Sequence, residues 1–262
     1  MARSSLRNVM NLIDTASAGI KTEDAFLNDL KRSIEESDMK SRTGKPSQTY
    51  KPSSMHCIRN MWFQVTGAEP DSSRNSYTGI GIVQSGTDIH KRIQTAIEHM
   101  KDNNIQCEYV DVEAFISENK LDNLQIREKY MHELKLYHKS LNISFMTDGI
   151  IHYKNRYYIL EIKTEISSKW YSREGVDPKH YNQAIAYAIA FNLDDVIFLY
   201  ISRDTLDMKA FMFHVTGQMK EDLIGKITEC DGYAERGIMP PKPEGLSRTV
   251  CNYCPYQSLC KR

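Results

Sequence analysis

Two apolar segments joined by a short polar turn constrain the fold most strongly. The stretch "SFMTDGIIHYKNRYYILEIKT" is rich in aromatic and β-branched residues on both sides of Lys154-Asn155, which is typical of β-strands. A two-residue turn there pairs Tyr153 with Arg156. The same register sets Asp148 opposite Glu161, so the sequence predicts a hairpin that brings two carboxylates together. A three-residue turn would move Asp148 to the other face unless a bulge corrected it.

Helical and strand patterns surround this hairpin. Apolar periodicity near 3.6 predicts helices in 5–37, in 55–67 with Ser54 as the N-cap, in 86–103 with Ile89, Ile93 and Ile97 on one face, and in 177–192. Alternating or β-branched runs predict strands in 132–138, 143–153, 156–164, 195–203 and 209–215. This order predicts an α/β (α+β) chain with helices first, then a mixed β-sheet with one long helix inserted, then a short cysteine-bearing tail.

Length and charge allow one main domain with an N-terminal appendage. The 262 residues can bury one sizeable core. The 34 Lys and Arg residues balance 34 Asp and Glu residues, so any contact with nucleic acid must come from a local patch. We expect residues 1–49 to form a helical arm and a basic linker, and residues 50–262 to form the main domain. For the linker, a solvated connector is favoured over a nucleic-acid contact, although it contains Lys40, Arg42, Lys45 and Lys51.

The cysteines indicate a metal centre. No apolar run reaches the roughly eighteen residues that a membrane helix needs, and the first residues do not resemble a secretory leader. We therefore expect a cytoplasmic protein with no membrane partner, in which thiols stay reduced. Under these conditions the cluster of Cys251, Cys254 and Cys260 points to a metal rather than to disulfides. Cys107 and Cys230 are expected to be ordinary buried thiols.

The acidic hairpin is the candidate catalytic site. Glu161 and Lys163 share one strand face, while Ile162 between them faces the core. With Asp148 opposite, the two carboxylates would attract a hard divalent cation such as Mg²⁺ or Mn²⁺. His90 could add an imidazole ligand, although an isolated histidine is more often a surface or core-edge residue. A metal and an adjacent ammonium suit phosphodiester hydrolysis. The competing interpretation is an exposed cross-strand ion pair.

Two further polar residues lie on the helix expected in 177–192. Gln183 and Tyr187 are four residues apart and therefore share one helical face, which by itself indicates only an ordinary hydrogen-bonding pair. The order of all these residues, however, resembles the PD-(D/E)XK nuclease signature of the RecB and AddB nuclease domains: His90, Asp148, Glu161-Ile162-Lys163 and Gln183-Ala-Ile-Ala-Tyr187. The resemblance covers roughly residues 50–262 and departs from the motif at Thr147, where the family has proline.

This resemblance implies a restriction-endonuclease-like core and a metal-dependent DNA exonuclease that acts on single strands or DNA ends in phage or bacterial recombination, repair or processing. It implies that His90, Asp148 and Glu161 are ligands of Mg²⁺ or Mn²⁺ and that Lys163 is the catalytic lysine. Gln183 and Tyr187 would position DNA or the catalytic residues. Partner proteins of a recombination complex and self-association are compatible with it. The alternative function is a non-catalytic module that binds DNA ends and retains the nuclease fold.

The cysteine pattern carries a second part of the resemblance. One cysteine before the core and a C-x2-C-x5-C cluster after it resemble the iron–sulfur subgroup that includes AddB and the CRISPR-associated RecB-like exonucleases. This implies a 4Fe–4S cluster bound by Cys57, Cys251, Cys254 and Cys260, which would link the two ends of the domain. Zinc stays the alternative because four thiolates suit either centre.

Overall fold

The computed structural model describes residues 21–41, 47–71, 76–130, 133–246, 248–252 and 254–261. The chain divides into two compact units, one of residues 1–44 and 73–84 and the other of residues 45–72 and 85–262. Helix α4 (Tyr77–Glu98) contributes to both units, since the boundary falls after Gln84. None of the helices within the described ranges is long and apolar enough to cross a membrane.

The described part of the first unit consists of α2 (Thr22–Ser41) and the first turns of α4. Within it, the Glu35 carboxylate accepts a hydrogen bond from the Tyr77 backbone N–H at 3.0 Å. The helix expected in 5–37 is confirmed from Thr22 onward, and residues 5–20 lie outside the described residues. Because α2 continues to Ser41, Lys40 belongs to a helix and not to the linker.

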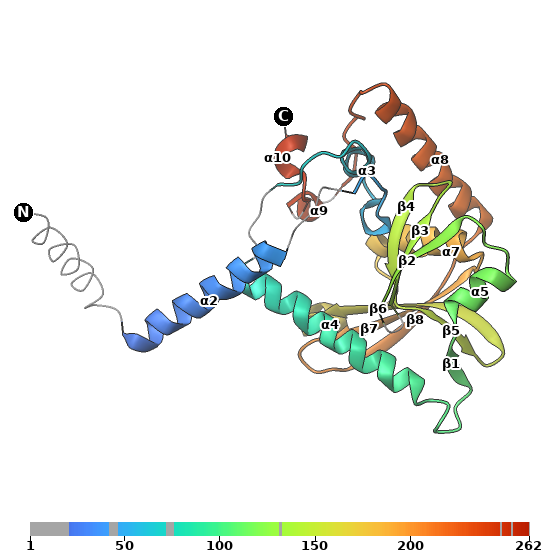
Figure 1. Cartoon of the computed structure of the whole chain (residues 1–262), viewed down its shortest axis with the longest axis horizontal. Coiled ribbons are helices and arrows are strands. Elements are labelled where there is room, and N and C mark those ends of the chain that lie inside the picture. Colours follow the sequence, from blue (N-terminus) through green and yellow to red (C-terminus); the bar gives the residue numbers. More distant parts are fainter. Residues whose placement is uncertain are drawn as a thin grey trace, which may run out of the picture. The chain divides into compact units, whose positions relative to one another are not determined.

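The second unit contains two β-sheets with helices around them (Figure 1). Its strands are β1 (Cys107–Tyr109), β2 (Leu124–Tyr130), β3 (Glu133–His138), β4 (Ile143–Thr147), β5 (Ile150–Tyr153), β6 (Arg156–Glu165), β7 (Asp195–Ser202) and β8 (Met208–His214). One sheet has the order β1-β5-β6-β7-β8 and the other the order β2-β3-β4. The pair β6–β7 is parallel and its neighbours are antiparallel. The predicted mixed sheet is confirmed, but a second sheet accompanies it.

Short and long helices complete this unit. They are η1 (Pro52–Ser54), α3 (Ile58–Val65), the remainder of α4, α5 (Val112–Glu118), α6 (Ser167–Tyr171), η2 (Pro178–His180), α7 (Tyr181–Phe191), α8 (Gly217–Glu235), α9 (Arg248–Asn252) and α10 (Gln257–Cys260). The sequence did not lead us to expect α5 and α8. Each follows a capping residue, Asp111 or Thr216, whose side chain accepts backbone N–H groups of the first turn.

The start of α3 differs from the prediction. Ser54 is not its N-cap, because Pro52 begins a 3₁₀ turn that includes Ser54. The extended residue that precedes α3 is Cys57, which makes no side-chain capping hydrogen bond. The α3 helix is therefore shorter at its N-terminus than expected, and one of the predicted thiol ligands lies at the point where the chain enters it.

The strand expected in 143–153 is interrupted, and this interruption positions the candidate site. β4 ends at Thr147 and β5 begins at Ile150. Gly149 has φ 125°, a conformation that favours glycine, and its N–H donates to Thr147 Oγ1 at 3.2 Å. The prediction of one continuous strand was wrong because the chain changes sheets here. Asp148 consequently lies at the junction of the two sheets.

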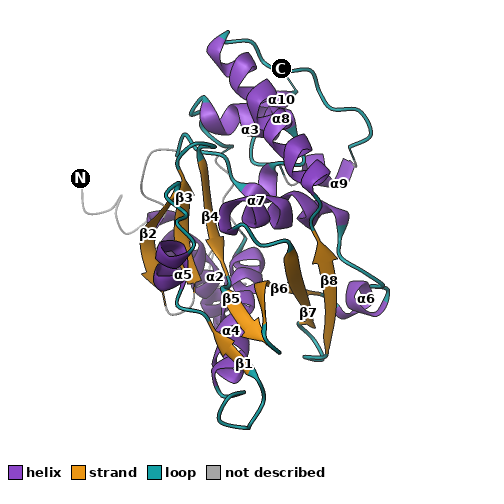
Figure 2. Ribbon diagram, turned by 90° about the vertical axis from the view of Figure 1, so that its right-hand side faces the viewer, coloured by secondary structure: helices purple, strands orange, loops and turns teal. Residues whose placement is uncertain are grey.

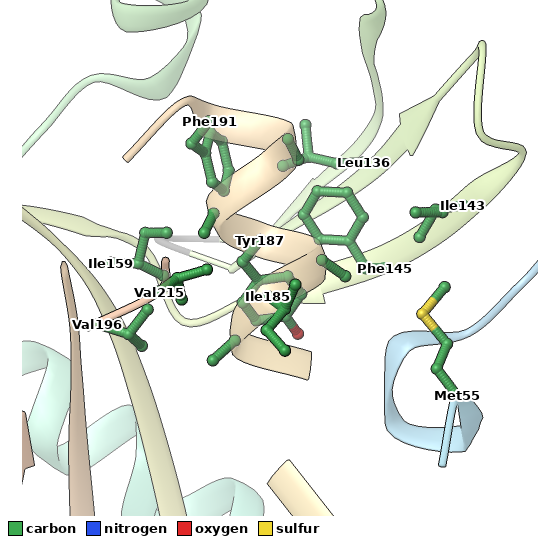
Figure 3. Packing of buried hydrophobic residues seen from close by; sticks show 14 of the residues in the cluster. Met55, Leu136, Ile143, Phe145, Ile159, Ile185, Tyr187, Phe191, Val196 and Val215 are labelled. Atoms are coloured by element: carbon green, nitrogen blue, oxygen red, sulfur yellow. The ribbon is translucent and has the colours of Figure 1, made fainter. Parts of the chain in front are cut away.

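The two faces of the five-stranded sheet pack on different helices. Ile89 and Ile93 of α4 pack in one cluster with Leu160 and Ile162 of β6, so the predicted apolar face of α4 is confirmed. Helix α7 covers the opposite face and also lies beside the three-stranded sheet (Figure 2). Figure 3 shows Tyr187 of α7 near Phe145 of β4, with their ring centroids 5.0 Å apart.

We expect Ala186→Leu to destabilise the protein by about 1–3 kcal/mol, the usual result of overpacking a core. Ala186 is fully buried in the α7 cluster, so added methylene groups have no space. Urea denaturation with an unchanged m-value measures the effect. Ala96→Leu on exposed α4 surface is the matched control and should change stability by no more than about 0.5 kcal/mol. Equal stability of the two variants would contradict close packing of α7.

Candidate active site

The hairpin β5–β6 has the predicted two-residue turn. Tyr153 pairs with Arg156, and Lys154 and Asn155 both have positive φ, 47° and 64°, as a type I′ turn requires. The same register continues toward the strand interruption, where the Leu160 N–H donates to the Gly149 carbonyl at 2.9 Å. The predicted turn and its register are therefore confirmed as far as Ile150 and Ile159.

Asp148 is held in place by two contacts from different elements. Its Oδ2 accepts a hydrogen bond from the Ile162 backbone N–H at 2.7 Å, so the side chain reaches the strand that carries Glu161. Its Oδ1 lies 3.0 Å from Nδ1 of His90 on α4. Asp148 is only 7% exposed. The predicted residues His90 and Asp148 thus meet, and His90 contacts the carboxylate directly.

The two carboxylate oxygens of Glu161 differ in their contacts. Oε1 accepts hydrogen bonds from Lys163 Nζ at 2.5 Å and from Gln183 Nε2 at 2.8 Å. Oε2 is buried and has no hydrogen-bond partner among the described residues. A buried, unpaired acceptor typically costs about 1–3 kcal/mol. A buried carboxylate oxygen of this kind is suited to a bound cation.

Burial controls the charge of this carboxylate. It raises the pKa of Glu161 to about 7, and the negative field of Asp148 acts in the same direction. The Lys163 ammonium is the largest influence that lowers this pKa, and the charge of His90 acts in the same direction as Lys163. A cation near Oε2 would favour the ionised form for the same electrostatic reason. The electrostatics of the site thus favour binding of positive charge.

Helix α7 supplies a hydrogen-bonded chain behind the charged pair. Gln183 Oε1 accepts from Lys163 Nζ at 2.9 Å, and Gln183 Nε2 also donates to Tyr187 Oη at 2.7 Å. Tyr187 Oη in turn donates to the Met146 carbonyl at 2.5 Å. Burial raises the pKa of Tyr187 well above its usual value, which keeps the phenol protonated as this donor. Gln183 and Tyr187 therefore orient Lys163 and Glu161. Because Glu161 is buried, its contact with Lys163 is not the exposed cross-strand ion pair of the competing interpretation.

Asp148 and Glu161 are the residues of the site that could hold a metal ion. Within the described ranges, no group of three or more His, Cys, Asp or Glu side chains is arranged to hold a metal ion. Asp148 and Glu161 nevertheless offer hard oxygen donors, including the unpartnered Oε2. Mg²⁺ is commonly bound through only one or two carboxylates, with water and substrate phosphate completing its coordination. The donor set fits such a metal without a third protein ligand.

The four cysteines predicted to bind a cluster line one cavity of about 70 Å³: Cys57, Cys251, Cys254 and Cys260. Arg59 Nη1 lies 3.5 Å from the Cys260 sulfur, and Asn60 Nδ2 lies 3.7 Å from the Cys254 sulfur. Burial raises the pKa of Cys254, and the neighbouring thiols raise it further. The chain thus gathers the four thiols, although not in a metal-binding arrangement. Cys107 and Cys230 lie elsewhere and are buried, as expected.

Two further residues face the site and were missed in the sequence. Lys179 and His180 line a cavity of about 480 Å³ together with Lys163 and Gln183. His180 precedes Gln183 by three residues, a spacing that places two helical residues on one face. This spacing, with a lysine beside it, was the available signal in "DPKHYNQ".

We expect His180 to make the folded state sensitive to acid. Its Nδ1 lies 2.8 Å from Tyr200 Oη, and burial lowers its pKa to about 3, with Lys163 and Lys179 adding to the effect. An unfolded histidine has a pKa near 6.5, so the unfolded state takes up the proton first. Stability is then lost as the pH falls from about 6.5 toward 3.

The size of this effect is about 1–2 kcal/mol between pH 6.5 and 5. Urea denaturation at several pH values measures it, and His180→Gln should flatten the dependence. His99→Gln, at an exposed position, is the control. An unchanged pH dependence in His180→Gln would show that His180 is not the responsible group.

Comparison with known proteins gives only distant structural likeness. No protein-family model and no curated protein matches the chain. Among solved structures, "Crystal structure of SSO0001" has a TM-score of 0.48 at 15% identity and covers 92% of this chain and 98% of that one. An alkaline exonuclease, LHK-Exo from Laribacter hongkongensis, has a TM-score of 0.45 at 9% identity and covers 73% and 90%. Its complex with dAMP has a TM-score of 0.44 at 9% identity and covers 72% and 89%.

Proposed function

We propose that residues 50–262 form a metal-dependent deoxyribonuclease of the PD-(D/E)XK type with a restriction-endonuclease-like fold. The observation that carries the proposal is the state of Glu161. One of its oxygens is paired with Lys163 and the other is buried without a partner among the described residues. Asp148 accepts a hydrogen bond from the backbone N–H of Ile162, which is on the same strand as Glu161. Asp148, Glu161 and Lys163 therefore lie close together, and they are the residues that the sequence resemblance assigns to catalysis.

In this proposal, Asp148 and Glu161 would hold Mg²⁺ or Mn²⁺. When bound, the metal would polarise the scissile phosphate and lower the pKa of a bound water. His90 contacts Asp148 Oδ1 and would orient that carboxylate or, through its ring, join the coordination. Lys163 would supply positive charge to stabilise the negative charge that develops on the oxygens of the scissile phosphate. Gln183 keeps the ammonium directed toward the site, because Lys163 Nζ donates to Gln183 Oε1 as well as to Glu161.

The substrate follows from the resemblance together with the site's chemistry. The order of the site residues along the chain, which resembles the PD-(D/E)XK signature, supports DNA as the substrate. The enzyme would act on single strands or on DNA ends, as in phage or bacterial recombination and repair. We also propose that Cys57, Cys251, Cys254 and Cys260 bind a 4Fe–4S cluster, supported by their common cavity. Its role would be structural, since a cluster joining Cys57 to the C-terminal tail closes a long loop.

The test is a nuclease assay. End-labelled single-stranded DNA, incubated with purified protein and Mg²⁺ or Mn²⁺, should be shortened, and EDTA should stop the reaction. Products that shorten stepwise from one end indicate an exonuclease, whereas internal fragments of a circular substrate indicate an endonuclease. Binding of DNA ends without any turnover in either metal would favour the non-catalytic module instead.

A further inference from the structure

A cleft beside the proposed catalytic residues is lined by basic and polar side chains and by part of the C-terminal tail. Four of its lining residues come from β6, η2 and α7: Lys163, Lys179, His180 and Gln183. Residues from before the sheet and from the C-terminal tail also line it: Ser53, Ser54, His56, Asn60, Val250, Cys254 and Pro255. Its volume of about 480 Å³ lies within the roughly 300–1,000 Å³ of pockets that enclose small organic ligands. Among the lining residues in the described part of the chain, two are lysines and none is acidic.

The charge of Lys179 is poorly compensated. Its Nζ lies 3.7 Å from Asp177 Oδ2, but the same oxygen also contacts Lys169 at 2.8 Å and Arg173 at 3.5 Å. Lys179 therefore makes the longest of three contacts to one oxygen. Its side chain is 51% exposed, and an ion pair of this kind contributes little. The ammonium remains able to bind an anion that enters the cleft.

His180 presents a second polar group to the cleft. Tyr200 Oη accepts a hydrogen bond from the Asp177 backbone N–H at 3.1 Å. The same oxygen lies 2.8 Å from His180 Nδ1. If the phenol proton is donated to Nδ1, the neutral ring carries its own proton on Nε2. Such a ring donates a hydrogen bond without carrying charge. A phosphate oxygen is an acceptor of the kind that both Lys179 and His180 would bind.

We infer that Lys179 and His180 bind a phosphate of the nucleic-acid strand next to the scissile phosphate. The residues of the C-terminal tail that line the cleft would then contact the adjoining sugar or base. This inference rests on the proposed function and specifies how the substrate is positioned. Val250 and Pro255 supply the apolar contact surface. Cys254 lines both this cleft and the thiol cavity, so the cysteine tail forms part of the substrate wall. Lys179 is a positioning residue and takes no part in bond cleavage.

The test compares Lys179→Gln with Lys169→Gln. Lys169 shares the Asp177 carboxylate but does not line the cleft, so it controls for loss of the ion-pair network. A 5′-fluorescein-labelled single-stranded oligodeoxynucleotide is titrated in EDTA at several salt concentrations, and binding is followed by anisotropy. Lys179→Gln should weaken affinity about tenfold, as loss of one hydrogen bond to a charged group does. It should also make the slope of log K against log [salt] about 0.7 less steep.

Steady-state rates with Mg²⁺ complete the test. Lys179→Gln should raise KM and leave kcat within about twofold, because the lost contact stabilises the bound substrate and the transition state equally. Lys179→Arg should restore both the affinity and the salt dependence of binding. Binding by Lys179→Gln equal to that of the wild type, in a protein that cleaves DNA, overturns the inference and leaves the proposed function intact. Wild-type binding that depends on Lys179 without any cleavage supports the inference and contradicts the nuclease function. Absence of binding by the wild type overturns both.

Discussion

Lys163→Ala should reduce DNA hydrolysis by about 10²–10³-fold, the scale found for removal of a group that stabilises transition-state charge. The ammonium of Lys163 donates to Glu161 Oε1 and to Gln183 Oε1, so it lies at the centre of the site. Its side chain is 23% exposed and can therefore reach a substrate phosphate. The rate is measured with end-labelled DNA under single-turnover conditions in Mg²⁺.

A second variant separates catalysis from folding. Lys163→Ala leaves the buried carboxylate without its cation, and breaking a buried pair in this way typically costs about 3–5 kcal/mol. Glu161→Gln has the same shape and removes the charge, so it should fold at least as stably and should also be inactive. Lys154→Ala, in the exposed turn of the same hairpin, is the matched control with full activity. Hydrolysis that persists in both pure variants would refute the catalytic assignment.

Cys254→Ser should abolish bound iron and lower the melting temperature by roughly 10–20 °C, corresponding to about 5 kcal/mol of lost metal-linked folding energy. Its sulfur lines the cavity that the four cysteines share and accepts a hydrogen bond from Asn60 Nδ2. The other thiols, from Cys57 and from the tail, surround the same space. A bound centre would therefore crosslink the tail to the start of α3. Calorimetry and metal analysis after anaerobic purification measure both effects.

Spectra and a matched cysteine control identify the centre. An iron–sulfur cluster predicts a brown protein with absorbance near 400 nm, whereas zinc predicts a colourless protein with the same dependence on Cys254. Cys107→Ser should retain the metal, because Cys107 is buried in a different cluster with β6 residues. If the wild type binds neither iron nor zinc, and Cys254→Ser melts at the same temperature, the cysteine tail functions without a metal.

The local part of the site could be predicted because it depends on short-range rules. Turn length determines hairpin register, so placing Lys154-Asn155 in a two-residue turn was sufficient to set the pairing of β5 with β6 up to Ile150 and Ile159. Strand alternation placed Glu161 and Lys163 on one face. Helical spacing placed Gln183 and Tyr187 together, and their hydrogen bond confirms it. Each of these inferences spans only a few residues of chain.

The interruption at Asp148-Gly149 was not predictable by the same rules. Strand-forming apolar residues lie on both sides of Thr147-Asp148-Gly149, and a single glycine permits a bend but does not require one. The bend forms because β4 pairs with β3 while β5 pairs with β1 and β6. Competition between two sheets for adjacent segments is a property of the whole fold. The α3 start at Cys57 was missed for a similar reason, since the favourable cap at Ser54 is used in a 3₁₀ turn.

The sequence by itself determined which side chains can act, in what order, and on which face of each element, because periodicity and turn geometry are local properties. Only the tertiary structure decided that Glu161 is buried with one oxygen unpartnered among the described residues, and that Lys179 and His180 line the cleft beside Lys163. Burial and charge balance arise from elements that are distant in the chain. Helix α7 must pack on β6 before Gln183 can direct Lys163, and that packing is decided by the core as a whole.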